Sequence, residues 1–184
     1  YFLNCALAGL SSGVLPHQGL THLEIVGFTD VPRTTSKFNK TQLDTMAVGG
    51  VWIVTQDLTG ADTSLGQIFT RHAITTGSYD NVNEREEMIT RNVDSISFRF
   101  KDTFKPFIGI TNVTPTIQSR LRVEAETLIR VLRSEAETAN LGGQLISAEI
   151  VELRPHLTLK DRYVIKINCV VPYSLNNVEI HLAI

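Results

Sequence analysis

The chain has 184 residues, of which 42% are hydrophobic, and its formal net charge is −2. These values are typical of one soluble globular domain, or of one domain with a fragment of a second. The charge gives no reason to expect binding to nucleic acid or to an anionic membrane, and no stretch approaches the roughly 18 apolar residues of a membrane helix. Cys5 and Cys169 lie within separate apolar runs, which predicts two buried thiols in a reducing compartment.

The N-terminal part of the chain predicts two helices. Residues 2–10 are small and apolar, and Gly9 or Gly13 would end their helix. Because the sequence begins inside this apolar pattern, we expect the chain to be the C-terminal piece of a longer protein. A Thr-x-x-Asp motif at 41–44 predicts the start of a second helix, and the Gly-Gly pair at 49–50 predicts its end.

A hairpin is predicted next, from two β-rich runs at 51–56 and 66–74 that are separated by turn residues. Arg71 and His72 are polar groups within its second strand. They are candidates for a function, but an edge strand with one solvated face is the favoured explanation for them. After this hairpin, Asn81 is a candidate N-cap for the following helix.

The most periodic segment of the sequence predicts a long amphipathic helix that ends at Pro106 and Gly109. Its predicted buried stripe consists of Ile89, Val93, Ile96, Phe100 and Phe104. The opposite face is built mainly from charges, among them Arg91 and Lys105, with Phe98 at its centre. A phenylalanine in the middle of a charged face indicates a contact residue for a partner.

A second long helix is predicted to begin at Thr114, with Pro115 in its first turn. Its buried stripe would consist of Ile117, Leu121, Ala125, Leu128 and Leu132. The outward face contains Arg130 and Arg133 and is more basic than acidic. Simple solvation is the favoured interpretation of that face, and a partner contact is the alternative.

Three further strands are predicted, at 147–153, 162–171 and 178–184. Strands on either side of a helix pair predict the α+β class, with a mixed or antiparallel sheet and two long helices packed on one face. The last strand alternates strictly, with Val178, Ile180, Leu182 and Ile184 on one side. It could pair with 162–171 through a turn at 176–177, or it could reach out from about residue 174 and add to the sheet of a neighbouring subunit.

No catalytic or metal-binding constellation is found in the sequence. The five histidines never fall into metal-ligand spacing, and the Gly-rich segments at 9–13 and 49–50 lack the residues of a nucleophile elbow or a phosphate-binding loop. We therefore expect no enzyme activity, no cofactor and no metal.

The order of these motifs resembles the contractile tail-sheath proteins of phages and related injection systems. The resemblance covers essentially the whole chain. Its elements are a small-residue helix and Pro-containing loop, a helix-to-strand passage, a strand that ends in Thr-Thr, a long helix and a terminal arm. In sequence these are "AGLSSGVLPHQGLTHLEIVGF", "NKTQLDTMAVGGVWIV", "IFTRHAITT", "NEREEMITRNVDSISFRF" and "VPYSLNNVEIHLAI".

This resemblance implies a domain organisation and a function. Residues 1–50 would end the sheath's central domain, which is subtilisin-like in fold only, and 51–184 would form the C-terminal sheath domain with the arm at 174–184. Subunits of the family stack as hexameric rings around a rigid tube, and their contraction drives this tube through a cell envelope. The partners would be other copies of the chain, the tube protein and baseplate proteins, with no nucleic acid and no membrane insertion. The protein would be located in the virion tail after assembly in the host cytoplasm.

The expected contact residues follow from the two helices and the arm. Arg91, Phe98, Lys105, Arg130 and Arg133 are candidates for binding the tube or a neighbour, and the alternating residues of 178–184 are candidates for binding an adjacent subunit. Two alternatives remain open at this stage: a tail terminator or baseplate component of the same machines, and a fragment of a hydrolase-like enzyme.

Overall fold

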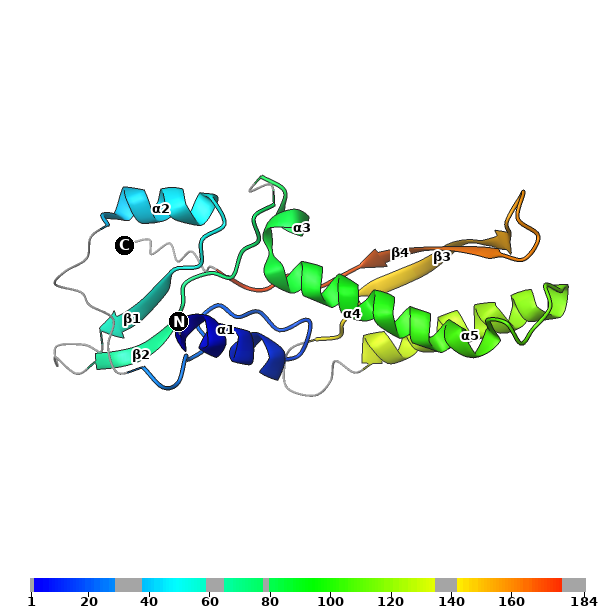
Figure 1. Ribbon diagram of the computed structural model, residues 1–184, viewed down its shortest axis with the longest axis horizontal. Coiled ribbons are helices and arrows are strands. Elements are labelled where there is room, and N and C mark those ends of the chain that lie inside the picture. Colours follow the sequence, from blue (N-terminus) through cyan, green and yellow to red (C-terminus); the bar gives the residue numbers. More distant parts are fainter. Residues whose placement is uncertain (1, 29–37, 59–64, 78–79, 135–141, 177–184) are drawn as a thin grey trace, which may run out of the picture. The chain divides into compact units, whose positions relative to one another are not determined.

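The computed structural model describes residues 2–28, 38–58, 65–77, 80–134 and 142–176. The chain divides into two compact units: unit 1 comprises residues 1–90 and 174–184, and unit 2 comprises residues 91–173. Helices and short antiparallel sheets make up both units (Figure 1), which confirms the α+β class. The expected single sheet is wrong, because the strands of the described residues form two separate two-stranded sheets, one in each unit.

Unit 1 begins with helix α1 (Phe2–Gly13), as the sequence predicts, and this helix contains no buried residue. Phe2 is 83% exposed, and Cys5 is also exposed. The prediction of two buried thiols is therefore wrong for Cys5. It is also wrong for Cys169, which lies in an exposed stretch near the end of a strand in unit 2.

Helix α2 (Lys40–Val48) starts two residues earlier than the Thr-x-x-Asp motif suggests. The Asn39 side chain accepts a hydrogen bond from the Gln42 backbone N–H, and the Gln42 side chain accepts one from the Asn39 N–H. This reciprocal capping box satisfies two backbone donors at once, so it defines the helix start in place of Thr41. The helix ends at Gly49 as predicted, and Gly50 follows with φ +84°.

Strands β1 (Val54–Leu58) and β2 (Leu65–Thr70) pair antiparallel, which confirms the predicted hairpin pairing. The core of unit 1 forms where β2 meets the loop after α1 and the first turn of helix α4 (Glu87–Phe104). The buried apolar side chains of this unit are Leu20, Ile25, Ile68, Phe69, Ala73, Ile74, Met88 and Ile89.

The expected domain boundary near residue 50 does not coincide with a division between compact units. The Val51 N–H donates to the Met46 carbonyl, and the Trp52 indole N–H donates to the Ile74 carbonyl at 2.6 Å. These bonds hold both sides of the expected boundary within unit 1. The assignment of 1–50 and 51–184 to two sheath domains stays a prediction.

Helix α3 (Val82–Arg85) begins at the predicted cap, where the Asn81 side chain accepts from the Asn83 N–H. The predicted long helix is interrupted at Glu86, whose backbone is extended (φ −78°, ψ 118°), and α4 then begins at Glu87. Glu86 forms an antiparallel bridge with Ile74. The interruption lets Glu86 pair with the segment that follows β2.

The predicted buried stripe of α4 is correct for Ile89 and Ile96 and wrong for Val93, which is 45% exposed. Asn92 is fully buried in place of Val93, and its side-chain amide donates to the Gln144 carbonyl at 2.8 Å. Phe100 is partly buried against the cluster of Ile96, Leu132 and Leu145. The buried face of α4 therefore extends toward Asn92 rather than toward Val93, while Ile89 and Ile96 keep their predicted places.

A short 3-10 helix (Lys105–Phe107) follows α4, and α5 (Pro115–Ser134) begins after Thr114, whose hydroxyl accepts from the Ile117 N–H. The buried residues of α5 are Ile117, Leu121, Ala125, Ile129 and Leu132. Four of these five were predicted. Leu128, the fifth predicted residue, is partly buried and packs against the same cluster as Phe100.

Strands β3 (Ser147–Pro155) and β4 (Tyr163–Val170) form an antiparallel hairpin with a bulge between Ile150 and Glu152. Side chains of α4 and α5 pack with this hairpin in two clusters, around Leu145 and around Leu153. Figure 1 shows α4 and α5 on the same side of the β3–β4 hairpin, as expected for helices on one face. The predicted strand at 178–184, and with it the exchangeable arm, lies outside the described residues.

Candidate functional site

The residues predicted to bind the tube or a neighbour lie on the helices of unit 2. Phe98 is 65% exposed, and Lys105, Arg130 and Arg133 are exposed as well. Arg91 was expected on the same outward face but is half-buried, and its Nε atom is inaccessible to solvent. The orientation of α4 that buries Asn92 accounts for this difference. Arg91 is therefore a poor contact residue, whereas the other four remain accessible.

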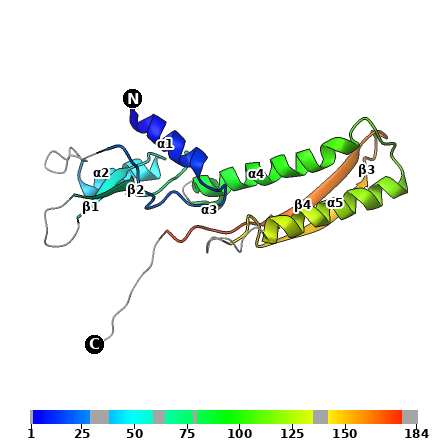
Figure 2. The same ribbon diagram turned by 90° about the horizontal axis from the view of Figure 1, so that it is seen from below.

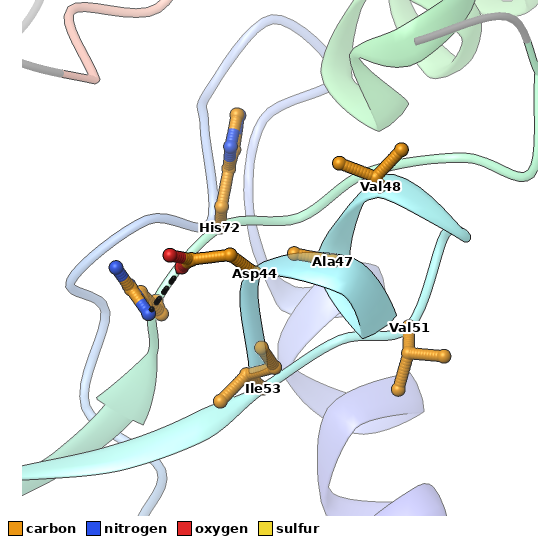
Figure 3. Close-up of a pocket in the computed structure, with 7 residues that line it drawn as sticks. Asp44, Ala47, Val48, Val51, Ile53 and His72 are labelled. Atoms are coloured by element: carbon orange, nitrogen blue, oxygen red, sulfur yellow. Dashed lines mark ion pairs between the residues drawn. The ribbon is translucent and has the colours of Figure 1, made fainter. Parts of the chain in front are cut away.

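Arg71 and His72, which follow β2 directly, have different surroundings. Arg71 is exposed and forms an ion pair with Asp44 of α2 at 3.5 Å. Figure 3 shows this pair at the edge of a pocket of about 190 Å³, lined also by Val48, Val51 and Ile53, with His72 beside it. A pocket of this size accommodates only a small group. Because its one ion pair lies in solvent, it contributes little to binding or stability.

His72 and Glu86 form the centre of a polar cluster in unit 1. His72 Nε2 lies 3.0 and 2.9 Å from the two carboxylate oxygens of Glu86. A carboxylate only accepts hydrogen bonds, so this geometry places a proton on Nε2. Arg85 Nε donates to the same carboxylate at 3.1 Å. The interruption between α3 and α4 brings Glu86 here, where it is only 4% exposed.

Asn176 completes the cluster from the far end of the chain. Its Nδ2 donates to Glu86 Oε2 at 3.1 Å and lies 3.2 Å from His72 Nε2, while its Oδ1 accepts from the Thr21 hydroxyl at 2.9 Å. These partners lie 90, 104 and 155 residues away in sequence. We call Thr21, His72, Glu86 and Asn176 the Asn176 clasp. It joins three segments of unit 1 that are distant in sequence.

The electrostatics of the clasp favour an ionised Glu86. Burial alone raises the pKa of its carboxyl, but hydrogen bonds and positive charge from His72 and Arg85 outweigh burial, so the pKa lies below the ordinary 4.5. The carboxylate is thus a charged acceptor for Asn176, and hydrogen bonds to charged groups are stronger than neutral ones.

The backbone next to Asn176 is also closely seated. A Cβ atom on Gly19 would lie 2.5 Å from the Ser174 hydroxyl oxygen, so a larger residue at position 19 would require the Ser174 side chain to move. Ser174 and Asn176 are therefore held by the loop that follows α1, on the side where Thr21 also contributes. The clasp holds Asn176, the last residue that the structure describes.

The chemistry of the clasp is that of an anchor. Both carboxylate oxygens of Glu86 accept bonds from side chains that hold the chain together, and the His72 nitrogen that faces Glu86 is a donor.

Within the described part of the chain, no group of three His, Cys, Asp or Glu residues could hold a metal ion. No helix among these residues is both long and apolar enough to cross a membrane.

Sequence analysis singled out His72 but missed Glu86, Thr21 and Asn176 as its partners. Asn176 was noted only as a turn residue before the terminal strand, and Glu86 was placed within a continuous helix. The burial of Glu86 depends on the break between α3 and α4, which no cap residue in the sequence marks. No local pattern connects Thr21 with Asn176.

The sequence was also compared with known proteins. No protein-family model and no curated protein sequence matches this chain.

Proposed function

We propose that this chain is the C-terminal part of a contractile tail-sheath subunit, a structural protein that surrounds a rigid tube and drives it through a cell envelope on contraction. The observation that carries the proposal is the Asn176 clasp together with the segment after it. Asn176 is anchored in unit 1, and the alternating strand pattern of 178–184 begins two residues later. An arm that is exchanged between subunits requires a fixed residue at its base, followed by a segment that can form a strand.

The helix–hairpin layer of unit 2 supports the same proposal. Helices α4 and α5 pack on the β3–β4 hairpin, whereas Val151 of β3 and Val170 of β4 are each 50% exposed. A two-stranded sheet offers backbone donors and acceptors along both outer edges. An arm from a neighbouring subunit can pair along such an edge and cover apolar side chains.

The energetics of a donated arm suit a subunit that stays connected while it rotates. A strand of this length forms about six backbone hydrogen bonds at a net of about 1 kcal/mol each. Burial of Val178, Ile180, Leu182 and Ile184 adds roughly 1.5–3 kcal/mol for each side chain. Ordering the arm and docking the subunits offset much of this gain. The remainder recurs at every subunit and keeps the rings joined.

Contacts with the tube are proposed on the exposed faces of α4 and α5, through Phe98, Lys105, Arg130 and Arg133. A sheath must hold the tube and then slide along it. Exposed charge pairs, each contributing less than about 1 kcal/mol, allow this better than a dry apolar interface. In this proposal the protein has no enzymatic turnover and is located in the virion tail.

Electron microscopy of the full-length protein, expressed with and without its tube protein, tests the proposal. We expect hollow tubes built from stacked rings, which shorten and widen on contraction. Dispersed particles of uniform small size under all assembly conditions would contradict it. The separate finding of a catalysed hydrolysis reaction that depends on His72 and Glu86 would replace it with an enzyme.

A further inference from the structure

The two loops at one end of unit 2 form a common tip. One is the connection between α4 and α5 (residues 105–114), and the other is the turn between β3 and β4 (residues 156–162). The Tyr163 hydroxyl donates to the Thr114 carbonyl at 2.9 Å, and Phe107 packs in the same cluster as Tyr163. Both views place the two loops at the same end of this unit (Figures 1 and 2).

The tip exposes apolar side chains from both loops. Ile108 and Ile110 are 73% and 82% exposed, and Leu157 and Leu159 are 83% and 42% exposed. Scattered single apolar residues are ordinary on a protein surface, but four from two adjoining loops form a patch, and such patches mark interaction sites. They contribute little to the core of unit 2, whose buried residues at this end are Ile117, Leu121 and Leu153.

Basic side chains surround these apolar residues. Lys105 and Lys160 are exposed, Arg162 is 64% exposed along its side chain, and Arg120 lies over the Phe107 ring at 5.2 Å. Asp161 is the acidic residue of the β-turn and forms a long ion pair with Arg162 at 3.9 Å. An apolar centre with a basic rim is complementary to a surface with exposed apolar groups and excess carboxylates.

Such a surface belongs to the other unit of the same chain. Residues 1–90 and 174–184 contain 5 Lys or Arg and 10 Asp or Glu, a net charge of −5. Residues 91–173 contain 12 Lys or Arg and 9 Asp or Glu, a net charge of +3. The two units together give the net charge of −2 of the whole chain. Val82 on α3 is exposed, and the acidic residues on either side of it in sequence, Asp80 and Glu84, are exposed as well. Unit 1 therefore combines negative charge with exposed apolar groups.

We infer that the tip of unit 2 docks on unit 1 of a second copy of this chain. The contact is heterologous, since the tip of one copy meets a different surface of the next, and such contacts generate rings or helical stacks. The inference rests on the proposed function, because a sheath subunit binds copies of itself, and it names a contact surface distinct from the terminal arm. Charge complementarity guides the approach, and the apolar residues stabilise the contact.

Sedimentation of the 184-residue chain over a range of concentrations tests the inference, at about 50 mM and about 500 mM salt. The wild-type chain should self-associate at low salt and dissociate at high salt. The tip variant Lys160→Glu/Arg162→Glu should raise the dissociation constant by about tenfold or more. The matched control Arg122→Glu/Lys166→Glu makes the same change in net charge at exposed positions outside the two loops and should raise it by less than about threefold.

A second pair of variants separates apolar contacts from charge. Ile110→Ser/Leu157→Ser should also raise the dissociation constant about tenfold, while circular dichroism stays unchanged because both side chains are already exposed. The variant Asp80→Lys/Glu84→Lys reverses the charge on the acidic side of the contact. When it is mixed with the tip variant Lys160→Glu/Arg162→Glu, the two proteins should associate with each other. A chain that stays monomeric at low salt, or tip and control variants that associate equally, would overturn the inference.

Further outcomes distinguish a failure of this inference from a failure of the proposed function, and distinguish a second copy of the chain from a lipid surface as the partner. Full-length protein with the tip variant that still forms contractile tubes would overturn the inference and leave the sheath proposal standing. If the chain associates through the tip but the full-length protein never forms tubes, the inference stands and the sheath proposal is overturned. Tip-dependent binding to vesicles of anionic lipid, without tip-dependent self-association, would replace the second copy by a membrane surface.

Discussion

At the scale of single residues, Glu86 connects the folding of unit 1 with the position of its C-terminal segment. Its carboxylate receives bonds from His72, Arg85 and Asn176. Its pKa is lower in the folded protein than the ordinary 4.5, so the folded state binds fewer protons than the unfolded state below this pH. The stabilisation is therefore fully present above pH 4.5 and is lost as pH falls through the lower folded-state pKa.

The Glu86→Gln variant tests this linkage. At pH 7 it should lower the free energy of unfolding by about 1–3 kcal/mol, since it removes charge-assisted hydrogen bonds from a buried site. Its stability should also fall less steeply than that of the wild type below pH 4.5. Urea unfolding at several pH values measures both effects. The exposed Glu24→Gln variant is the control, and a Glu86→Gln variant with the wild-type pH dependence would contradict the account.

Asn176 should respond differently to two substitutions. Asn176→Ala removes the bonds to Thr21 and Glu86. Asn176→Asp keeps an acceptor for the Thr21 hydroxyl but replaces the donor to Glu86 with a second carboxylate, where like charges repel. Hydrogen exchange at residues 19–21 and 174–176 should therefore be faster in both variants than in wild type at pH 7, and fastest in Asn176→Asp. Equal exchange in all three proteins would remove Asn176 from the role of anchor.

At the scale of elements, most signals that depend on neighbouring residues were reliable, although the Thr41 motif misplaced the start of α2. The Asn81 and Thr114 caps and the Gly49 stop are short-range features, and the structure has each of them. The phase of α4 was predicted wrongly at Val93 because Asn92 is held inside by the Gln144 carbonyl, 52 residues away. From periodicity alone, an asparagine at this position is expected to face the solvent. The hydrogen bond to Gln144, which the sequence does not reveal, is what buries Asn92.

The orientation of α4 predicts losses of stability of very different size for the truncation of two phenylalanines. Phe100 packs against Ile96 and Leu132, so Phe100→Ala should cost about 3 kcal/mol, near the lower end for such truncations because the ring is only partly buried. Phe98 is 65% exposed, so Phe98→Ala should change stability by less than about 0.5 kcal/mol. Thermal unfolding measures both. Equal losses would mean that the helix has another orientation.

At the scale of the whole chain, the sequence predicted the α+β class and the β1–β2 hairpin, but neither the β3–β4 pairing nor the division into units. Strands β1–β2 and β3–β4 were expected in one sheet because both flank the helix pair in sequence. The return of residues 174–176 to unit 1 depends on contacts over more than 90 residues, as between Asn176 and His72. Such contacts leave no periodic pattern, so the clasp and its anchoring role could not be predicted.

In the sheath that we propose, residues 178–184, anchored through Asn176, connect neighbouring subunits. Deletion of Val178–Ile184 from the full-length protein tests it most directly, with electron microscopy for assembly and circular dichroism for the fold. Because the clasp residues all remain, we expect a folded, soluble protein that forms no sheath. Deleted protein that still polymerises into tubes which contract without breaking apart would contradict the claim.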